Sequence, residues 1–300
     1  FKQKTAYEIG VRLVGSEMCI RDRTMMKLPK TFLRGSIPPL ITPFRNGKVD
    51  YDAYAGLVEF QVKNGSHGIL VNGTTSEPAS LTVEERNRLV DVAIDAAAGK
   101  LPIVAATGSQ NLQETSALTE YAEKAGADAL LIVTPYYTRP PQRGLVEYYK
   151  VLGKQTSLPW MIYHIPGRAA VSVTLDTLDQ ISKACPNFVG MKHAVDDLGF
   201  ASECLDHFGM DFRIFVGLED LSYPMMAVGA CGLMNAVGNL QPKKLAKMCE
   251  AVWSGELKKA QKLHYDLFEI NQAVFFLSLI HISEPTRRTP ISYAVVGLKK

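Results

Sequence analysis

The stretch Phe188-Val189-Gly190-Met191-Lys192-His193-Ala194 decides the fold class, because its apolar, β-branched character recurs along most of the chain. Eight such runs recur, most of them ending at or beside Gly or Pro, and each is followed by a helical pattern. They cover residues 36–44, 67–73, 102–108, 127–135, 159–166, 188–194, 212–217 and 230–237. Because the runs are continuously apolar and are separated by helices, they predict parallel strands of a sheet that is covered on both faces.

Eight strand and helix units in about 240 residues predict an α/β chain folded as a (β/α)8 TIM barrel rather than an open doubly wound sheet. The helical pattern is clear over residues 83–98 and 111–125. Thr82, with Glu85 three residues later, predicts a capping box at the start of the first of these helices. The sequence contains no Gly-x-Gly-x-x-Gly or Walker-type loop, which argues further against a nucleotide-binding open sheet.

The composition indicates an ordinary globular protein of 300 residues, 47% hydrophobic and 21% charged. No apolar window is long enough for a transmembrane helix, so we expect no membrane partner. Five cysteines without a Cys-x-x-Cys pair indicate reduced thiols. They argue against a disulfide scaffold or a zinc finger and predict a cytoplasmic location.

The net charge of +3 is carried by the two ends of the chain. Residues 1–24 and 277–300 together hold nine Lys or Arg and four Asp or Glu. The remaining 24 Lys or Arg and 26 Asp or Glu give the middle a net charge of −2. This balance argues against nucleic acid as a partner.

The same two ends look foreign to the rest of the sequence. Residues 1–24 and 277–300 show no sustained helical or strand period and resemble the translation of sequencing-adapter DNA. We expect both to be non-native segments, with a natural start near Met25 and a TIM-barrel catalytic domain over residues 25–276. The alternative is a natural disordered tail at each end. The eighth barrel helix is expected at about residues 243–276.

A TIM barrel gathers its catalytic groups at the C-terminal ends of the strands. Lys192 stands at such an end, after the apolar run 188–191. Burial there is costly for an ammonium, since desolvation favours the neutral amine. A neutral amine can attack a ketone and form a Schiff base. The alternatives are a surface lysine or an ion pair with Asp196 or Asp197.

Four motifs, each at a different strand end, carry a resemblance to a known family. They are Gly73-Thr74-Thr75-Ser76-Glu77, Thr134-Pro135-Tyr136-Tyr137, Tyr163-His164-Ile165-Pro166-Gly167-Arg168 and Gly190-Met191-Lys192. In the order and spacing of these motifs, the chain resembles the dihydrodipicolinate synthase and N-acetylneuraminate lyase family over about residues 35–276.

The resemblance implies a TIM-barrel lyase that condenses pyruvate with an aldehyde, L-aspartate-4-semialdehyde. The product would be 4-hydroxy-tetrahydrodipicolinate, in lysine and diaminopimelate biosynthesis. Relatives with the same barrel and lysine leave an alternative open. In that alternative the chain is another pyruvate-type class I aldolase or dehydratase, acting on a 2-keto-3-deoxy sugar acid or a similar 2-oxo acid.

By the same resemblance, Lys192 captures pyruvate as an imine and Tyr163 is the general acid and base beside it. Thr74 and Tyr137 match the hydroxyls of its proton relay. In the family, the tyrosine at the place of Tyr137 crosses a dimer interface, so the resemblance implies a homo-oligomer, a tetramer built as a dimer of dimers. Without the motif, Tyr137 would be interpreted as an aromatic packing residue. The covalent lysine–pyruvate imine makes a separate cofactor unnecessary.

The remaining matched positions imply substrate contacts. Thr75 and the backbone after Gly73 match the pocket for the pyruvate carboxylate, where small residues allow close approach. Arg168 matches the arginine that binds the carboxylate of the second substrate, and its planar fork suits that contact. Gly217 and Met234 fall where the family lines the pyruvate pocket with backbone groups.

Three departures from the family pattern stand out. Ser76 replaces a usual glycine and His193 replaces an acidic residue. We also expect the family's C-terminal helical extension to be missing after residue 276. His193 should point away from the barrel axis if Lys192 points inward, because strand residues alternate. We therefore expect packing roles for His193 and for His164.

Two other classes of function share features with this sequence. The two histidines raise a metal-dependent class II aldolase, but no Asp, Glu and His set stands at ligand spacing, so no metal is expected. A barrel of this fold can also be an inactive binding protein, since fold does not dictate activity. The presence of both Lys192 and Tyr163 argues against that alternative.

Overall fold

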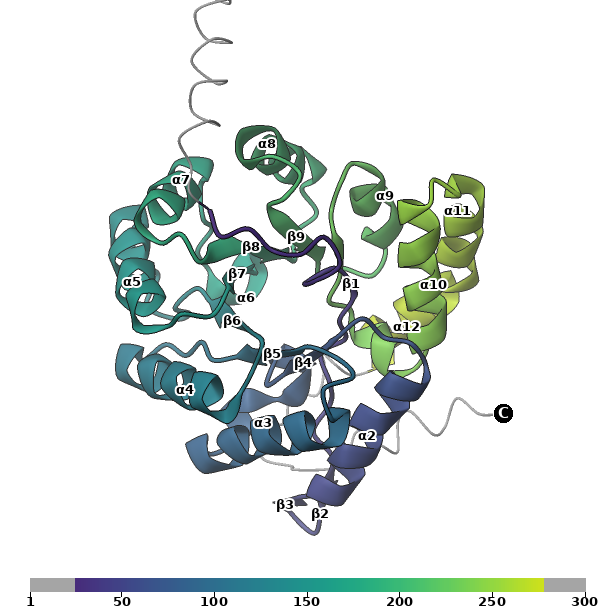
Figure 1. The fold of residues 1–300 in the computed structure, drawn as a ribbon, viewed down its shortest axis with the longest axis horizontal. Helices are drawn as coiled ribbons and strands as arrows, with labels where there is room; N and C mark the ends of the chain where they lie inside the picture. The colour runs from purple at the N-terminus through teal and green to yellow at the C-terminus, as the bar shows by residue number, and fades with distance from the viewer. Residues whose placement is uncertain (1–24, 278–300) are drawn as a thin grey trace, which may run out of the picture.

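The computed structural model describes residues 25–277, and these residues form a ring of strands enclosed by helices (Figure 1). Eight strands pair in parallel in the order β1-β10-β9-β8-β7-β6-β5-β4. Their bounds are β1 Gly35–Ser36, β4 Ile69–Val71, β5 Ile103–Ala106, β6 Ala129–Val133, β7 Trp160–His164, β8 Phe188–His193, β9 Arg213–Val216 and β10 Gly232–Leu233.

The ring is closed by the residues that follow β1. Leu40 N–H donates to Leu70 O at 3.0 Å, and Leu70 N–H donates to Pro38 O at 3.0 Å. Pro39 and Leu70 also form an isolated parallel bridge. Each of the eight predicted runs contains or overlaps one of the barrel strands, and the predicted (β/α)8 barrel is confirmed.

The first predicted strand, residues 36–44, was too long. Only Gly35–Ser36 is regular strand, because Pro38 and Pro39 have no N–H to donate to a ladder. Phe44 instead belongs to an antiparallel hairpin of β2 Phe44–Arg45 and β3 Lys48–Val49. Its turn residues Asn46 and Gly47 both have positive φ, as the favoured two-residue hairpin turn requires.

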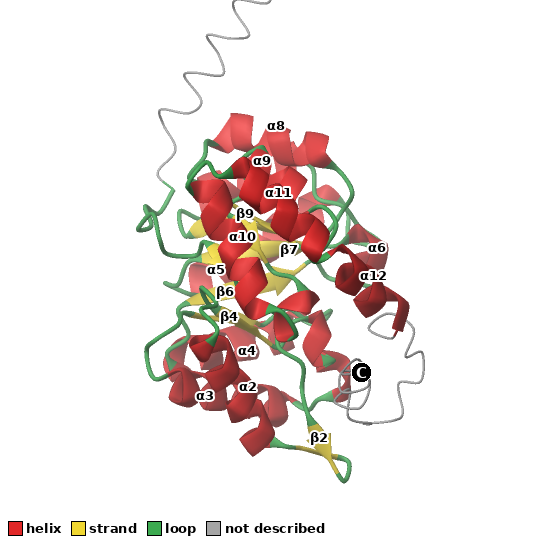
Figure 2. Ribbon diagram, turned by 90° about the vertical axis from the view of Figure 1, so that its right-hand side faces the viewer, coloured by secondary structure: helices red, strands yellow, loops and turns green. Residues whose placement is uncertain are grey.

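The helices surround the strands, as the side view shows (Figure 2). The capping box at Thr82 and Glu85 is confirmed, and Asn111 caps the helix that was predicted over residues 111–125. The bounds of the helices are α2 Tyr51–Lys63, α3 Val83–Ala97, α4 Leu112–Ala125, α5 Gln142–Gln155, α6 Pro166–Ala169, α7 Leu175–Ala184, α8 Leu198–Phe208, α9 Ser222–Ala227, α10 Pro242–Trp253, α11 Leu257–Asp266 and α12 Phe268–Leu277. Three 3₁₀ turns lie between them, η1 Thr74–Ser76, η2 Pro78–Ser80 and η3 Ala236–Asn239.

The prediction of a single eighth helix over residues 243–276 was wrong. The barrel helix α10 ends at Trp253, and Gly255 follows with φ of +72°, a conformation that stops a helix. Helices α11 and α12 then follow as separate elements. The expectations about residues 1–24, about residues 278–300 and about the missing extension lie outside the described residues.

Two layers of apolar side chains fill the structure. One cluster lies inside the ring and includes Leu131, Met161 and Phe215. A larger cluster lies between the strands and the helices and includes Trp160 and Ile162. Alternation along each strand sorts its residues into these layers, so interior positions near the strand ends are where polar groups can reach a ligand.

None of the helices between residues 25 and 277 combines the length and the hydropathy that crossing a bilayer demands. The four cysteines in the same range, at positions 185, 204, 231 and 249, are buried and form no disulfide.

A β-bulge in β8 reverses the alternation just before Lys192. Trp160 of β7 pairs with Phe188, but the next residue, Met161, pairs with Gly190, so Val189 is one residue extra. Residues 188 and 192 would otherwise share a face of the strand. Because of the bulge, Phe188 packs in the outer layer while Lys192 lies opposite Tyr163, which belongs to the interior cluster.

Gly190 makes this bulge possible. A Cβ at this position would lie 2.0 Å from the backbone oxygen of Arg213 on the neighbouring strand, far inside any real contact distance. No side-chain rotation relieves a contact with a backbone atom.

We predict that Gly190→Ala lowers the free energy of unfolding by about 2 to 4 kcal/mol, because β8 must move away from β9. Gly56→Ala is the matched control, since Gly56 lies exposed inside α2 with nothing within 4 Å of an added Cβ. It should raise the free energy of unfolding by up to about 1 kcal/mol. Urea unfolding measures both, and an unchanged midpoint for Gly190→Ala would refute the bulge geometry.

Candidate functional site

Lys192 and Tyr163 face each other across the neighbouring strands β8 and β7, near their C-terminal ends. The Lys192 Nζ atom lies 4.4 Å from the centroid of the Tyr163 ring. Lys192 is 4% exposed and Tyr163 is 7% exposed. Within residues 25–277, Lys192 forms no ion pair with Asp196 or Asp197, so the expected alternatives of a surface lysine or such a pair do not describe it.

Thr74 joins this pair from the loop after β4. Its Oγ1 donates to the Tyr163 hydroxyl over 3.4 Å, a long hydrogen bond. Ser76 keeps the loop in place, since its buried hydroxyl donates to Leu40 O at 2.6 Å and its carbonyl accepts from Thr42 Oγ1 at 2.9 Å. The serine that departs from the family pattern therefore braces the loop from behind.

The same loop offers backbone donors beside Thr74. Gly73 precedes the 3₁₀ turn η1, and the N–H groups of Ser76 and Glu77 are used inside the turn. The first N–H groups of such a turn, those of Thr74 and Thr75, have no acceptor within it. Donors of this kind can bind a carboxylate.

Gly217 and Met234 also lie at strand ends around Lys192. A Cβ on Gly217 would lie 3.1 Å from Lys192 Cε, so this glycine leaves space directly beside the lysine. Met234 follows β10, is buried, and its N–H donates to Val216 O at 2.9 Å. Both predicted positions are therefore at the strand ends around Lys192.

Arg168 and Tyr137 lie farther out. Arg168 is an exposed residue of α6, which follows β7 directly, and its side chain is paired with no residue between 25 and 277. Tyr137 is 90% exposed and has φ of +72°, an unusual conformation for tyrosine. Within the described chain it makes no hydrogen bond to Thr74 or Tyr163, so a single copy does not assemble the predicted relay.

The two histidines pack on the outside of the barrel, as predicted. His193 is fully buried and its Nδ1 lies 3.2 Å from Nδ1 of His164. His193 Nε2 lies 3.1 Å from the carbonyl oxygen of Asp197, which can only accept, so His193 carries its proton on Nε2 and His164 donates between the rings. Burial lowers the pKa of both, to about 4 for His164, which keeps the pair neutral at pH 7.

Glu219 is a site residue that the sequence reasoning missed. It stands two residues after Gly217, is 2% exposed, and its Oε1 accepts from Ala236 N–H at 2.7 Å. Its Oε2 is buried without a partner among the described residues. An acidic residue just past a strand end was the available signal.

Burial raises the pKa of Glu219 to about 7, although the backbone N–H of Ala236 and the charge of Lys192 both oppose the rise. A carboxyl near Lys192 with such a pKa can hold or release a proton at neutral pH. Within residues 25–277, no three His, Cys, Asp or Glu side chains gather as a bound metal ion would require.

Known proteins resemble this chain over most of its length. The model of the dihydrodipicolinate synthetase family matches residues 32–282. A 4-hydroxy-tetrahydrodipicolinate synthase of Thermus thermophilus is 43% identical over 244 residues, which cover 81% of this chain and 82% of the relative. Among solved structures, the dihydrodipicolinate synthase of Aquifex aeolicus has a TM-score of 0.80 at 37% identity, covering 83% of this chain and 85% of that one. The Acinetobacter baumannii enzyme, complexed with pyruvate, has a TM-score of 0.81 at 29% identity and covers 88% of each chain.

We predict a pH-dependent stability change for Glu219→Gln. The pKa of Glu219 is raised in the folded chain. As the pH rises from about 4.5 to 7, the unfolded chain therefore loses this proton before the folded chain does. The folded state loses stability over the same range. Glutamine does not titrate. The free energy of unfolding of Glu219→Gln, relative to the parent chain, should therefore rise by about 2 to 3 kcal/mol between pH 5 and pH 8.

Urea unfolding at the two pH values measures the difference. Glu84→Gln, at an exposed position in α3, controls for the loss of one carboxylate. The same difference at both pH values for Glu219→Gln would show that Glu219 is ionised throughout.

Proposed function

The chain belongs to the dihydrodipicolinate synthetase family, and from this premise we propose that it condenses pyruvate with L-aspartate-4-semialdehyde to give 4-hydroxy-tetrahydrodipicolinate. The observation that carries the proposal is the buried Lys192 facing Tyr163, with Thr74 bonded to the tyrosine hydroxyl. Among the described residues, no carboxylate lies at salt-bridge distance from Lys192. A buried lysine without such a partner is suited to act as a nucleophile.

In the proposed reaction, the ammonium of Lys192 first gives up a proton, and the resulting amine attacks the ketone carbon of pyruvate. Water then leaves and an imine forms. The imine draws electrons from the methyl carbon. That carbon therefore loses a proton, and the imine becomes an enamine. The enamine adds to the aldehyde of the second substrate. The amino group of that substrate then attacks the imine carbon and displaces Lys192, which closes the ring and frees the enzyme.

Each of these steps moves a proton, and Tyr163 is our candidate for exchanging it. A phenol needs a relay to do so at neutral pH, and the hydroxyl of Thr74 is already bonded to it. We propose that Tyr137 completes the relay from a second copy of the chain. Its 90% exposure and its projection from the loop after β6 favour that arrangement.

The protein would hold each substrate through the substrate's own carboxylate group. We assign the pyruvate carboxylate to the N–H groups of Thr74 and Thr75 after Gly73, with Gly217 and Met234 lining the other side. We assign the carboxylate of the second substrate to Arg168, because its guanidinium is exposed and unpaired within the described chain. No cofactor enters this proposal, since the imine itself withdraws the electrons. The tetramer and the cytoplasmic location stay predictions.

We predict that Arg168→Ala lowers kcat/KM for aspartate-semialdehyde by about 30- to 1,000-fold, the loss of about 2 to 4 kcal/mol from a carboxylate contact. Pyruvate should still be bound covalently. Lys100→Ala removes an exposed cation beside the opposite end of the barrel and should leave kcat/KM unchanged.

A steady-state assay with both substrates measures this. Turnover of a 2-keto-3-deoxy sugar acid by the parent chain, with none of aspartate-semialdehyde, would overturn the proposed function. An unchanged kcat/KM for Arg168→Ala would overturn only the assignment of the arginine.

We predict that two inactive variants restore activity when they are mixed. In a hybrid dimer of one Lys192→Ala chain and one Tyr137→Phe chain, one of the two sites is complete. Its lysine comes from the Tyr137→Phe chain and its tyrosine from the Lys192→Ala chain. Random pairing in a 1:1 mixture should therefore return about a quarter of the parent activity. The variants are unfolded, mixed and refolded together, and each alone is the control. Failure of the mixture to exceed the controls would show that Tyr137 does not act across an interface.

A further inference from the structure

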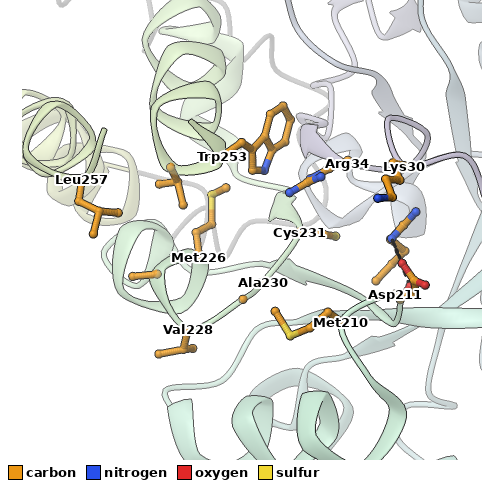
Figure 3. Close-up of a pocket in the computed structure, with 14 residues that line it drawn as sticks. Lys30, Arg34, Met210, Asp211, Met226, Val228, Ala230, Cys231, Trp253 and Leu257 are labelled. Atoms are coloured by element: carbon orange, nitrogen blue, oxygen red, sulfur yellow. Dashed lines mark hydrogen bonds and ion pairs between the residues drawn. The ribbon is translucent and has the colours of Figure 1, made fainter. Parts of the chain in front are cut away.

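A cavity of about 490 Å³ lies at the N-terminal end of the barrel, away from Lys192 (Figure 3). Its walls come from the segment before β1, the loops that precede β9 and β10, the ends of α9 and α10, and the start of α11. Arg213 begins β9, and Gly217 follows the end of the same strand. At about 3.3 Å per residue, the two lie roughly 13 Å apart along the strand.

The cavity is strongly basic. Lys30, Arg34 and Arg213 line it, and Asp211 is the one acidic residue among its lining residues within the described range. The side chain of Asp211 is 95% exposed, and its carboxylate reaches Arg213 only at 4.0 Å. The carboxylate therefore lies mostly in solvent and leaves the charge of the cavity largely uncompensated.

Both arginines keep an unused donor in the protein interior. Arg213 is 4% exposed, and its two terminal nitrogens donate to the carbonyl oxygens of Asp211 at 3.2 Å and of Pro29 at 3.1 Å. Its Nε–H, like that of Arg34, is buried without an acceptor between residues 25 and 277. Because neither Nε atom has surface open to the cavity, the arginine donors that a ligand can reach are the terminal nitrogens of Arg34, which have no acceptor among residues 25–277.

The opposite wall is apolar. Figure 3 shows Trp253, Met226 and Leu257 on the side of the cavity away from Lys30, with Met210 below. The guanidinium of Arg34 lies over the ring of Trp253, 4.7 Å from its centroid, which fixes the position of the cation.

Cys231, which also lines the cavity, adds no negative charge. Burial raises the pKa of the Cys231 thiol to about 12, so the thiol stays neutral at pH 7. A ligand that fits both walls needs an anionic group for the arginines and an apolar body for the tryptophan side.

We propose that this cavity is a second, non-catalytic binding site for a small organic carboxylate with an apolar body. Its carboxylate accepts from the terminal N–H groups of Arg34, with Lys30 and Arg213 adding positive charge, and its body lies against Trp253 and Met226. The proposal does not depend on the catalytic assignment, since it uses no residue of the Lys192 site.

Trp253 provides a local probe. The chain has two tryptophans, and the other, Trp160, is fully buried in the outer layer of the barrel. The full chain is titrated with cyclohexanecarboxylate, with the neutral cyclohexanecarboxamide, and with inorganic phosphate, which lacks the apolar body. Tryptophan fluorescence follows binding, and calorimetry repeats the titration. All titrations are repeated on Lys192→Ala, because the catalytic site could also bind a carboxylate.

We expect a saturable fluorescence change with the carboxylate, a much weaker response to phosphate and none to the amide. Arg34→Gln should weaken binding by about tenfold or more and the exposed Lys30→Gln by about threefold, since each removes charge from the cavity. Lys100→Gln, an exposed cation outside the cavity, and Lys192→Ala should bind as the parent does. Trp253→Phe should lose the fluorescence change.

Any of four results would overturn the proposal. They are the absence of saturable binding, equal binding of the amide, unchanged affinity in both Arg34→Gln and Lys30→Gln, and loss of binding in Lys192→Ala. The first and last would leave the proposed catalytic function untouched, because that function is read from turnover.

Discussion

The register between β7 and β8 is the constraint on which the site depends. One extra residue, Val189, lets Phe188 pack outside the barrel while Lys192 lies inside it. Tyr163 is then directly opposite the lysine, and His164 is opposite His193 on the outer face. A slip of one residue would exchange the two faces and put the histidines inside. Gly190 permits this register because the backbone of β9 occupies the place of its side chain.

The polar groups of the barrel gather at its two ends for the same physical reason. The middle of the interior is filled by side chains such as Leu131 and Phe215, so buried charge is tolerated only where backbone donors or a ligand can reach it. Glu219 illustrates this at the C-terminal end, where backbone N–H groups hold one oxygen and the pKa is raised to about 7. Arg213 illustrates it at the other end, where carbonyl oxygens take two of its nitrogens.

Much of this architecture could be predicted from the sequence, because continuous apolar runs closed by Gly or Pro are a strong signal of buried parallel strands. The place of Lys192 at a strand end could be predicted from the apolar run before it, whereas the role of Tyr163 came from the resemblance to a known family. Other features needed the structure. The register that the bulge at Val189 creates depends on the pairing of β8 with β7, which Gly190 alone does not specify, and the exposure of Tyr137 depends on how its loop folds. Three signals were present but unused: the Asn46-Gly47 hairpin turn, the helix stop at Gly255, and the acidic Glu219 just past a strand end.

The central claim is that Lys192 forms a covalent imine with pyruvate, and reductive trapping tests it most directly. The chain is incubated with pyruvate and borohydride, digested, and mapped by mass spectrometry. The account predicts one reduced pyruvate adduct per chain, on the peptide that contains Lys192, and none on Lys192→Ala protein. An adduct on a different lysine, or an equal yield of adduct from Lys192→Ala protein, would contradict it.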